Sequence, residues 1–154
     1  MNLSDKDSKL IWHPFTQHQT APPNIAIVKG KDALLWDENG MEYIDAISSW
    51  WTNIFGHSNP YIAEAIKLQS EQLEHVIFAG FTHRPAVDVA EKILGILPPD
   101  QQKVFFSDNG STAVEVALKM AIQYWYNKNT SKKTIIAFNN AYHGDTFGAM
   151  SVGA

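Results

Sequence analysis

The chain has 154 residues, of which 45% are hydrophobic and 18% charged, so it is long enough for one domain and apolar enough to bury a core. Its formal net charge of -4 argues against nucleic acid or anionic membranes as main partners, because both attract basic surfaces. The lack of cysteine excludes disulfides, thiolate metal sites and a cysteine nucleophile. No apolar stretch suits a signal peptide or a membrane span, so we expect a cytoplasmic protein.

The first part of the chain combines an irregular arm with short strands. Residues 1–24 have few periodic apolar positions and several prolines, which predicts an arm or loop. The short strand patterns at 33–37 and 41–45 flank the pair Asn39-Gly40, which is typical of a hairpin turn. We therefore expect a small antiparallel sheet after the arm.

The rest of the chain predicts alternating helices and strands. Helical patterns cover residues 59–76, which start with an Asn-Pro pair, and residues 85–97, which end before two prolines. Strand patterns at 103–107 and 133–138 flank a helical pattern over 111–128. This order predicts a βαβ unit and therefore a parallel sheet. The long helical segment is apolar on more than one face, so we expect it to be largely buried.

A polar, glycine-containing turn at residues 108–112 joins the first of these strands to the long helix. The free N–H groups and the positive dipole end of a helix start suit an anion, and ligands of parallel sheets lie beyond the strands' carboxyl ends. Gly110 permits close approach of a phosphate, and Ser111 and Thr112 add hydroxyl donors. Taken alone, a simple helix cap is the commoner explanation. The P-loop, dinucleotide and nucleophile-elbow motifs do not occur.

The loop at residues 139–146 carries further chemistry. In a βαβ unit the two strand ends can lie side by side, so we expect this loop to face the turn at 108–112. Tyr142 is suited to stack on a cofactor ring. We expect His143 to be a structural hydrogen-bond donor rather than a general base. The six histidines show no ligand spacing, so no metal is predicted.

Two aromatic segments precede this region. In an extended segment the adjacent Trp50 and Trp51 would point to opposite faces, so that one is core and the other lines a pocket. The alternative is a pair of core tryptophans. Residues 11–17 are aromatic-rich within the arm and are suited to cover a site or a partner subunit, or to tuck against the domain.

With these motifs in view, the sequence resembles the class-III pyridoxal-phosphate aminotransferases. The resemblance runs from about residue 11 to the end, and two of its segments point to the branch that serves biotin biosynthesis. That branch transfers an amino group from S-adenosylmethionine to 8-amino-7-oxononanoate and gives 7,8-diaminononanoate. The segments that carry the resemblance are residues 11–17, 48–57, 81–87, 107–125 and 140–152, of which the first two indicate the branch.

The resemblance implies a fold and a domain organisation. It implies an α/β fold, namely the N-terminal part of a fold-type-I transferase that depends on pyridoxal phosphate. Residues 1–58 would form the N-terminal arm and small-domain strands. Residues 59–154 would form the start of the large domain with its parallel sheet, which is incomplete here. The family also implies a homodimer with sites at the subunit interface.

The resemblance also implies roles for single residues. Gly110 and Ser111 match the pair that holds the phosphate of pyridoxal 5'-phosphate. Tyr142 matches the aromatic residue that stacks on the pyridine ring and borders the substrate. Trp50 matches a wall of the substrate pocket. Phe15 lies where some members carry a tyrosine that contacts the substrate, and it lacks that hydroxyl.

No residue of this chain matches the family's catalytic lysine, which forms the Schiff base with the cofactor, or the aspartate that pairs with the pyridine nitrogen. Both are expected downstream. The resemblance therefore implies an N-terminal portion that is inactive alone and a complete protein that is a transaminase. The amino donor stays open between S-adenosylmethionine and lysine. The alternatives are another class-III aminotransferase acting on an ω-amino substrate, and a non-catalytic domain that binds a phosphate ligand.

Overall fold

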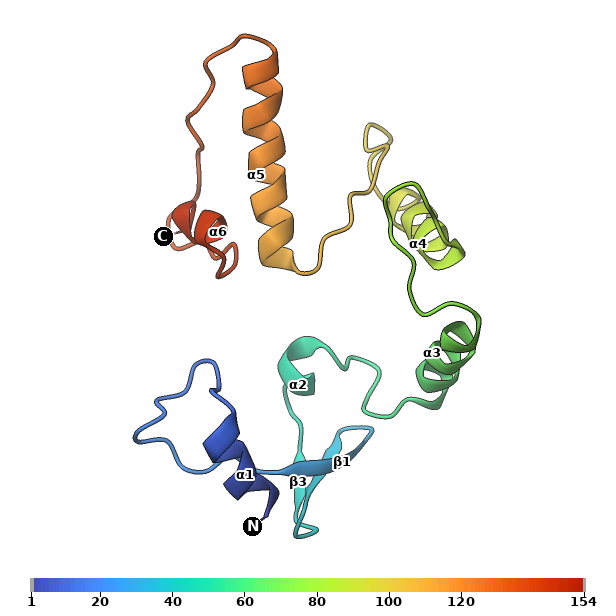
Figure 1. The fold of residues 1–154 in the computed structure, drawn as a ribbon, viewed down its shortest axis with the longest axis vertical. Helices are drawn as coiled ribbons and strands as arrows, with labels where there is room; N and C mark the ends of the chain where they lie inside the picture. The colour runs from blue at the N-terminus through green and yellow to red at the C-terminus, as the bar shows by residue number, and fades with distance from the viewer. Residues whose placement is uncertain (1, 154) are drawn as a thin grey trace. The chain divides into compact units, whose positions relative to one another are not determined.

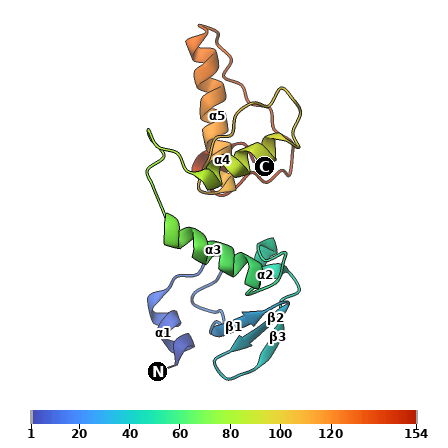
Figure 2. The same ribbon diagram turned by 90° about the vertical axis from the view of Figure 1, so that its right-hand side faces the viewer.

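The computed structural model describes residues 2–153 and divides into two compact units, Met1–Phe78 and Ala79–Ala154 (Figures 1 and 2). The division falls between residues 78 and 79. The sequence predicted a domain boundary between residues 58 and 59, which concerns the domains of the complete protein and stays a prediction. None of the described helices is long and apolar enough to cross a bilayer.

A three-stranded antiparallel sheet forms the centre of the first unit (Figure 2). Its strands are β1 (Ile27–Lys31), β2 (Leu34–Asp37) and β3 (Glu42–Ile44), in that order. The predicted hairpin between β2 and β3 is confirmed, and Gly40 in its turn has a φ of 82°. The buried Asp37 carboxylate accepts two backbone N–H groups of the turn at 2.9 Å each, which fixes the register of the hairpin.

The N-terminal arm contains a helix that the sequence analysis missed. Helix α1 spans Leu3–Leu10, where an arm or loop was predicted. Its start is capped by Asn2, whose side-chain oxygen accepts the N–H of Asp5 at 2.7 Å. Because none of its residues is buried, apolar periodicity gave no sign of it, whereas the cap residue did.

Helices α3 and α4 begin close to where the sequence predicted them. Helix α3, Pro60–Gln72, starts after Asn59, whose side-chain oxygen accepts two N–H groups of the first turn at 3.1 and 3.3 Å. It ends four residues before the predicted end at residue 76. Helix α4, Arg84–Leu94, starts one residue before Pro85 and is followed by Gly95.

The second unit is built around helix α5, Gly110–Asn127, which confirms the predicted long helix. After α5 the chain runs back along it, and the short helix α6, Phe147–Ser151, packs against the beginning of α5 (Figure 1). A hydrogen bond from the Gly148 N–H to the Glu115 carboxylate, 2.9 Å long, holds α6 in this place. The turn and the loop that the sequence singled out are thereby brought together.

Two predictions about the second unit are wrong. The structure assigns no strand to residues 103–107 or 133–138, so the described chain contains no βαβ unit. A strand exists only where a neighbour completes its hydrogen-bond ladder, and a strand pattern cannot specify that neighbour. None of the residues of α5 is buried either. A helix that is apolar on several sides needs several packing elements, and within its own unit α5 receives α6 and the adjoining loops.

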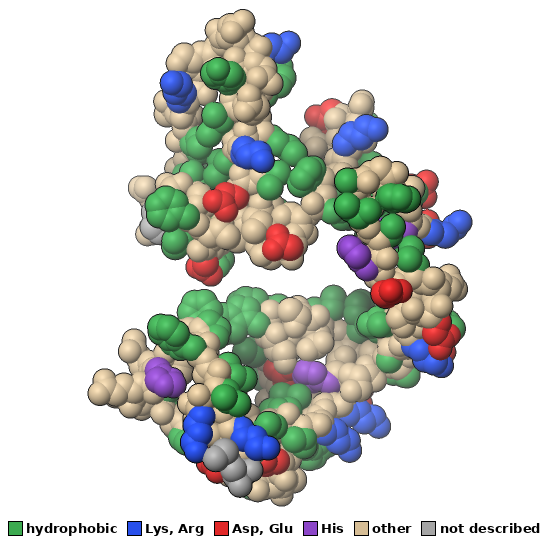
Figure 3. Space-filling model, viewed as in Figure 1, with side chains coloured by type: hydrophobic (Ala, Val, Ile, Leu, Met, Phe, Trp, Pro, Cys, Tyr) green, Lys and Arg blue, Asp and Glu red, His purple; other side chains and the backbone are tan. Residues whose placement is uncertain are grey.

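Little of the described chain is buried, and hydrophobic side chains lie on the surface of both units (Figure 3). Among the described residues the buried hydrophobic side chains are Ala86 in α4 and Ala149 in α6. Ala149 is fully buried and belongs to α6, the helix that packs against α5.

Candidate functional site

The first turn of α5 combines a complete cap with two backbone donors that stay available. The Asn109 side chain accepts the Thr112 N–H at 2.9 Å, and the Thr112 hydroxyl accepts the Asn109 N–H at 3.3 Å. Within the described part of the chain, the N–H groups of Gly110 and Ser111 have no acceptor. The first turn contains no acidic residue. The helix cap and an anion site therefore coexist here, and the dipole of α5 favours a negative ligand.

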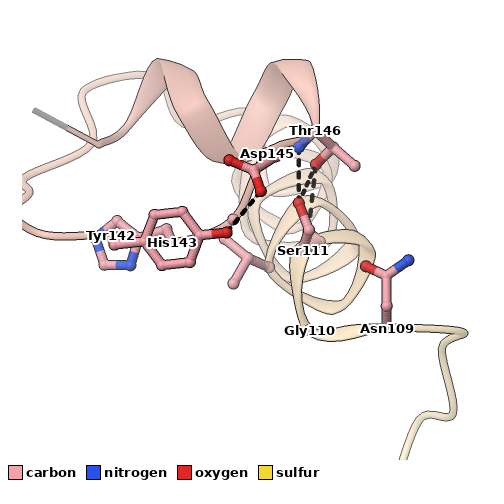
Figure 4. Close-up of a pocket in the computed structure, with 9 residues that line it drawn as sticks. Asn109, Gly110, Ser111, Tyr142, His143, Asp145 and Thr146 are labelled. Carbon is pink, nitrogen blue, oxygen red and sulfur yellow. Dashed lines mark hydrogen bonds between the residues drawn. The ribbon is translucent and has the colours of Figure 1, made fainter. Parts of the chain in front are cut away.

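A second set of contacts fastens the loop before α6 to this helix start (Figure 4). The Ser111 Oγ accepts the Thr146 N–H at 2.8 Å and lies 2.7 Å from the Thr146 hydroxyl. Gly144 has a φ of +119°, and a Cβ added to it would overlap the Ser111 side chain. Only glycine allows this close approach. The prediction that the loop faces the turn is confirmed.

The helix start and the loop line an open depression of about 710 Å³. Tyr142 projects into it with an exposed ring, and its hydroxyl donates to the Asp145 carboxylate at 2.8 Å (Figure 4). This hydrogen bond raises the pKa of Tyr142 and fixes the orientation of its ring. The residues that line the depression are Asn109, Gly110, Ser111, Val114, Tyr142, His143, Gly144, Asp145 and Thr146.

His143 lines the depression. Among the described residues its ring makes no hydrogen bond, so its role as a structural donor stays a prediction. The loop is instead held by the backbone N–H of Thr146 and by Asp145. A ring nitrogen of His143 stays available to a ligand or to solvent.

The start of α5 presents hydrogen-bond donors to the depression. Asp108 lies outside the lining residues, and its carboxylate is held by the hydroxyls of Thr112 and Ser107. The hydrogen bond from Thr112 is the main cause that lowers the pKa of Asp108. Asp145 carries the carboxylate within the lining, and it is engaged by Tyr142. The helix start itself is therefore electrostatically positive, because the N–H groups of Gly110 and Ser111 are its free polar groups.

In the first unit, two residues that the resemblance assigned to the substrate lie together. The rings of Phe15 and Trp50 stack with centroids 5.7 Å apart and planes 20° apart. Trp51 meets Trp50 edge-on at 5.9 Å. All three rings are exposed. The segment is not extended, so the prediction that the tryptophans point to opposite faces is wrong, and neither is a core residue.

The structure also reveals participants that the sequence analysis did not single out. Thr146 fastens the loop to α5, and the Nε2 of His57 lies 2.7 Å from the Asp45 carboxylate beside the tryptophans. Spacing gave no sign of them, because their partners are distant in sequence or adopt unusual backbone angles. The described residues contain no group of three His, Asp or Glu side chains that would hold a metal ion, so the expectation of no metal stays a prediction.

Comparisons with known proteins identify the family of this chain. The family model of the class-III aminotransferases matches residues 15–154. The chain therefore belongs to the class-III aminotransferase family. This confirms the family that the sequence motifs indicated.

The names of individual relatives indicate a narrower group than the family does. The adenosylmethionine-8-amino-7-oxononanoate aminotransferase of Synechococcus elongatus is 57% identical over 143 residues, which are 93% of this chain and 34% of that protein. The protein of the same name from Staphylococcus aureus is 45% identical over 157 residues, covering 98% of this chain and 35% of its own. The chain thus spans about a third of the length of these relatives.

Solved structures of relatives have the same fold. The adenosylmethionine-8-amino-7-oxononanoate aminotransferase of Methanocaldococcus jannaschii matches with a TM-score of 0.92 and 42% identity, over 98% of this chain and 35% of that one. The omega transaminase of Pseudomonas jessenii, solved in complex with PMP, matches with a TM-score of 0.90 and 29% identity, over 99% and 35%. The expected fold class, an N-terminal portion of an α/β aminotransferase, is confirmed.

Proposed function

We propose that this chain is the cofactor-binding N-terminal portion of a transaminase that uses pyridoxal 5'-phosphate. The complete protein transfers an amino group from S-adenosylmethionine to 8-amino-7-oxononanoate and yields 7,8-diaminononanoate. The observation that carries the proposal is the donor-lined helix start at Gly110 and Ser111, with the Tyr142 ring in the same depression. The names of the relatives from Synechococcus and Staphylococcus support the choice of substrates.

The residues present fit the phosphate of this cofactor. A Cβ built on Gly110 meets nothing within 4 Å, so a phosphate has room to approach the backbone. Two backbone N–H groups and the Ser111 hydroxyl are donors suited to its oxygens. The exposed ring of Tyr142, held by Asp145, offers a flat face to the pyridine ring. When bound, pyridoxal phosphate supplies an electron sink for the carbanion formed during amino-group transfer.

In the proposed reaction, the residues of this chain bind and orient the cofactor and the substrate. Gly110 and Ser111 hold the phosphate, and the contact between Ser111 and Thr146 keeps the Tyr142 loop at a fixed distance from it. Trp50 and Phe15 offer stacked apolar surface to the substrate. We assign no catalytic residue to this chain, because the family's lysine is expected downstream. A homodimer in the cytoplasm is part of the same proposal.

The test uses the full-length protein. We expect it to retain pyridoxal phosphate, with a visible absorption band that S-adenosylmethionine changes, and to form 7,8-diaminononanoate from 8-amino-7-oxononanoate. A protein that retains no pyridoxal phosphate would contradict the cofactor assignment. A retained cofactor that reacts with lysine or with ω-amino substrates, and not with S-adenosylmethionine, would keep the family and move the function to another class-III transaminase.

A single substitution tests the site itself. Ser111→Ala removes both a donor to the phosphate and the acceptor of the Thr146 N–H, which corresponds to about 1–3 kcal/mol for such a loss. We expect the dissociation constant of pyridoxal phosphate to rise by roughly tenfold to a hundredfold. Ser70→Ala on the exposed side of α3 is the matched control and should leave this constant unchanged. Equal constants for both variants would remove Ser111 from the phosphate site.

A further inference from the structure

Helix α2, Ser48–Trp51, is a left-handed turn. All four of its residues have φ between 46° and 67°, and none of them is glycine. For L-amino acids this region costs roughly 1–2 kcal/mol per residue, and non-glycine residues visit it singly rather than in runs. Strain of this kind persists only where surrounding contacts enforce it.

The Asp45 side chain contacts the turn from the end of the sheet. Asp45 follows β3 directly, and its backbone N–H donates to the Ala33 carbonyl at 2.9 Å, which continues the hairpin ladder. Its carboxylate is 6% exposed and accepts the Ser49 hydroxyl at 2.7 Å. The backbone N–H of Ser49, followed by this hydroxyl and by His57, lowers the pKa of Asp45 to about 2. A fixed negative charge at the end of the sheet thus binds the middle of the turn.

His57 contacts the same residues of the turn and the sheet end. Its Nε2 lies 2.7 Å from the same Asp45 oxygen and 3.4 Å from the Ser49 hydroxyl. Its backbone is tied to Asp32, next to β1, by two hydrogen bonds of 2.8 and 3.1 Å. A Cβ on Gly30 of β1 would lie 2.9 Å from the His57 Cβ, so the imidazole sits directly on the sheet. Asp45 and His57 are therefore both anchored to the sheet, and both contact Ser49 in the strained turn.

The turn determines where the Trp50 ring lies. Ser49, which Asp45 and His57 hold, immediately precedes Trp50 in the chain. The Trp50 ring makes few contacts of its own, since it is 60% exposed and meets only Phe15 and Trp51 among the described rings. A return of the backbone to an ordinary conformation would swing this side chain away. The place of the ring is thus set through the backbone rather than by packing.

We propose that Asp45 and His57 are positioning residues: they hold the left-handed turn Ser48–Trp51 and thereby place the Trp50 ring against Phe15 as one wall for the substrate. The role of this wall in substrate binding rests on the proposed function. The placement of the ring does not, and it can be measured without substrate. Asp45 and His57 touch neither cofactor nor substrate in this proposal and act through the turn.

The experiment uses Asp45→Asn, His57→Gln and Trp50→Ala in the full-length protein loaded with pyridoxal phosphate. We expect Asp45→Asn to raise the KM for 8-amino-7-oxononanoate about tenfold and to change kcat by less than about twofold, because binding geometry is lost and the chemistry is not. In a Trp50→Ala background the same substitution should have almost no further effect, since it acts through that ring. His57→Gln retains a side-chain N–H near the position of Nε2 and should lie between Asp45→Asn and the unchanged protein.

A second readout needs no substrate. Closely coupled indoles contribute strongly to circular dichroism in the aromatic region, and Trp50 and Trp51 are 5.9 Å apart. Asp45→Asn should reduce this signal to the level of Trp50→Ala. The matched control is Asp37→Asn, which removes a buried carboxylate at the opposite end of the same hairpin and should lower stability while leaving KM and the aromatic signal unchanged.

The outcomes separate the two proposals. An unchanged aromatic signal in Asp45→Asn, or effects of Asp45→Asn and Trp50→Ala that simply add, would overturn the positioning role. A Trp50→Ala variant with unaltered KM would overturn the substrate wall. If the unchanged protein does not aminate 8-amino-7-oxononanoate, the proposed function fails, and the aromatic signal alone still decides whether Asp45 places the ring.

Discussion

The two ligand sites that we propose for this chain are built in opposite ways. At the start of α5, ordinary helical geometry and a complete capping box leave the N–H groups of Gly110 and Ser111 free to bind. At Ser48–Trp51 the backbone is in an unfavourable region, and in our proposal the Asp45 and His57 side chains, anchored to the sheet, hold it there. The first site results from local chemistry and the second from long-range restraint. The two should therefore respond differently to the same kind of substitution.

The largest loss of cofactor binding is expected at Gly144, where the loop closely approaches Ser111. In Gly144→Ala the new Cβ overlaps Ser111 and the backbone retains a positive φ, so the Tyr142 loop is pushed off α5. Strain of this type costs on the order of 1–3 kcal/mol before the clash is counted, so retention of pyridoxal phosphate should fall more than about tenfold. Titration of the full-length protein with the cofactor measures this.

Gly80→Ala is the control for this prediction. Gly80 also has a positive φ of +85°, but a Cβ there meets nothing within 4 Å. It should share the backbone cost and keep the cofactor. If Gly144→Ala binds pyridoxal phosphate as tightly as Gly80→Ala, the close contact with Ser111 is not needed for the site.

A smaller effect is expected from the cap of α5. Asn109→Ala removes the acceptor of the Thr112 N–H, and the loss of such caps costs about 1 kcal/mol of stability. Urea denaturation of the full-length protein should show a lower midpoint with an unchanged slope. No change in the midpoint would mean that the capping box is not the contact that determines where α5 starts.

At the second site, by contrast, we expect a substitution to raise the stability of the protein. Ser48 has a φ of 48°, and its hydroxyl makes no hydrogen bond within the described residues, so Ser48→Gly relieves strain without removing a contact. We expect a gain of about 0.5–1 kcal/mol in the free energy of unfolding. The same denaturation measurement checks this. A loss of stability would show that the turn is not strained at this position and would weaken the contrast between the two sites.

The smallest effect is in the pH dependence of stability. The folded pKa of Asp45 is about 2, below its ordinary value of 3.8, so its contribution is present above the ordinary value and is lost as the pH falls toward the folded value. Thermal melts between about pH 5 and pH 3 should therefore fall more steeply for the unchanged protein than for Asp45→Asn. Parallel curves would mean that the carboxylate gains nothing from the turn.

The sequence predicted local features well. Asn39-Gly40 located the hairpin, Asn59-Pro60 located the start of α3, and the polar turn located the start of α5 within one residue. Each of these signals works through neighbouring residues, so that short-range physics is sufficient. Helix α1 shows the limit of apolar periodicity, because a helix that buries nothing leaves no apolar pattern and its cap residue is the only sign.

Features that depend on distant partners were predicted poorly. Residues 103–107 and 133–138 have strand patterns, but a pattern does not supply the neighbour that completes a ladder. The apolar faces of α5 likewise indicate burial without specifying what covers them. The link between Asp45, Ser49 and His57 requires a left-handed backbone that propensities for L-residues disfavour, so no spacing rule would have found it.

The left-handed turn has a consequence for the order of folding. Its anchors exist only after β2 and β3 have paired and Asp32 has bridged to His57, since Asp45 and His57 are carried by those elements. The turn is unfavourable until then, so it should form after the rate-limiting step of folding. Substitutions of Ser49 and Asp45 should therefore change stability with little change in the folding activation free energy, which is a low kinetic φ-value. Substitutions there should accelerate unfolding and leave the folding rate nearly unchanged, which makes this short segment a determinant of the lifetime of the first unit.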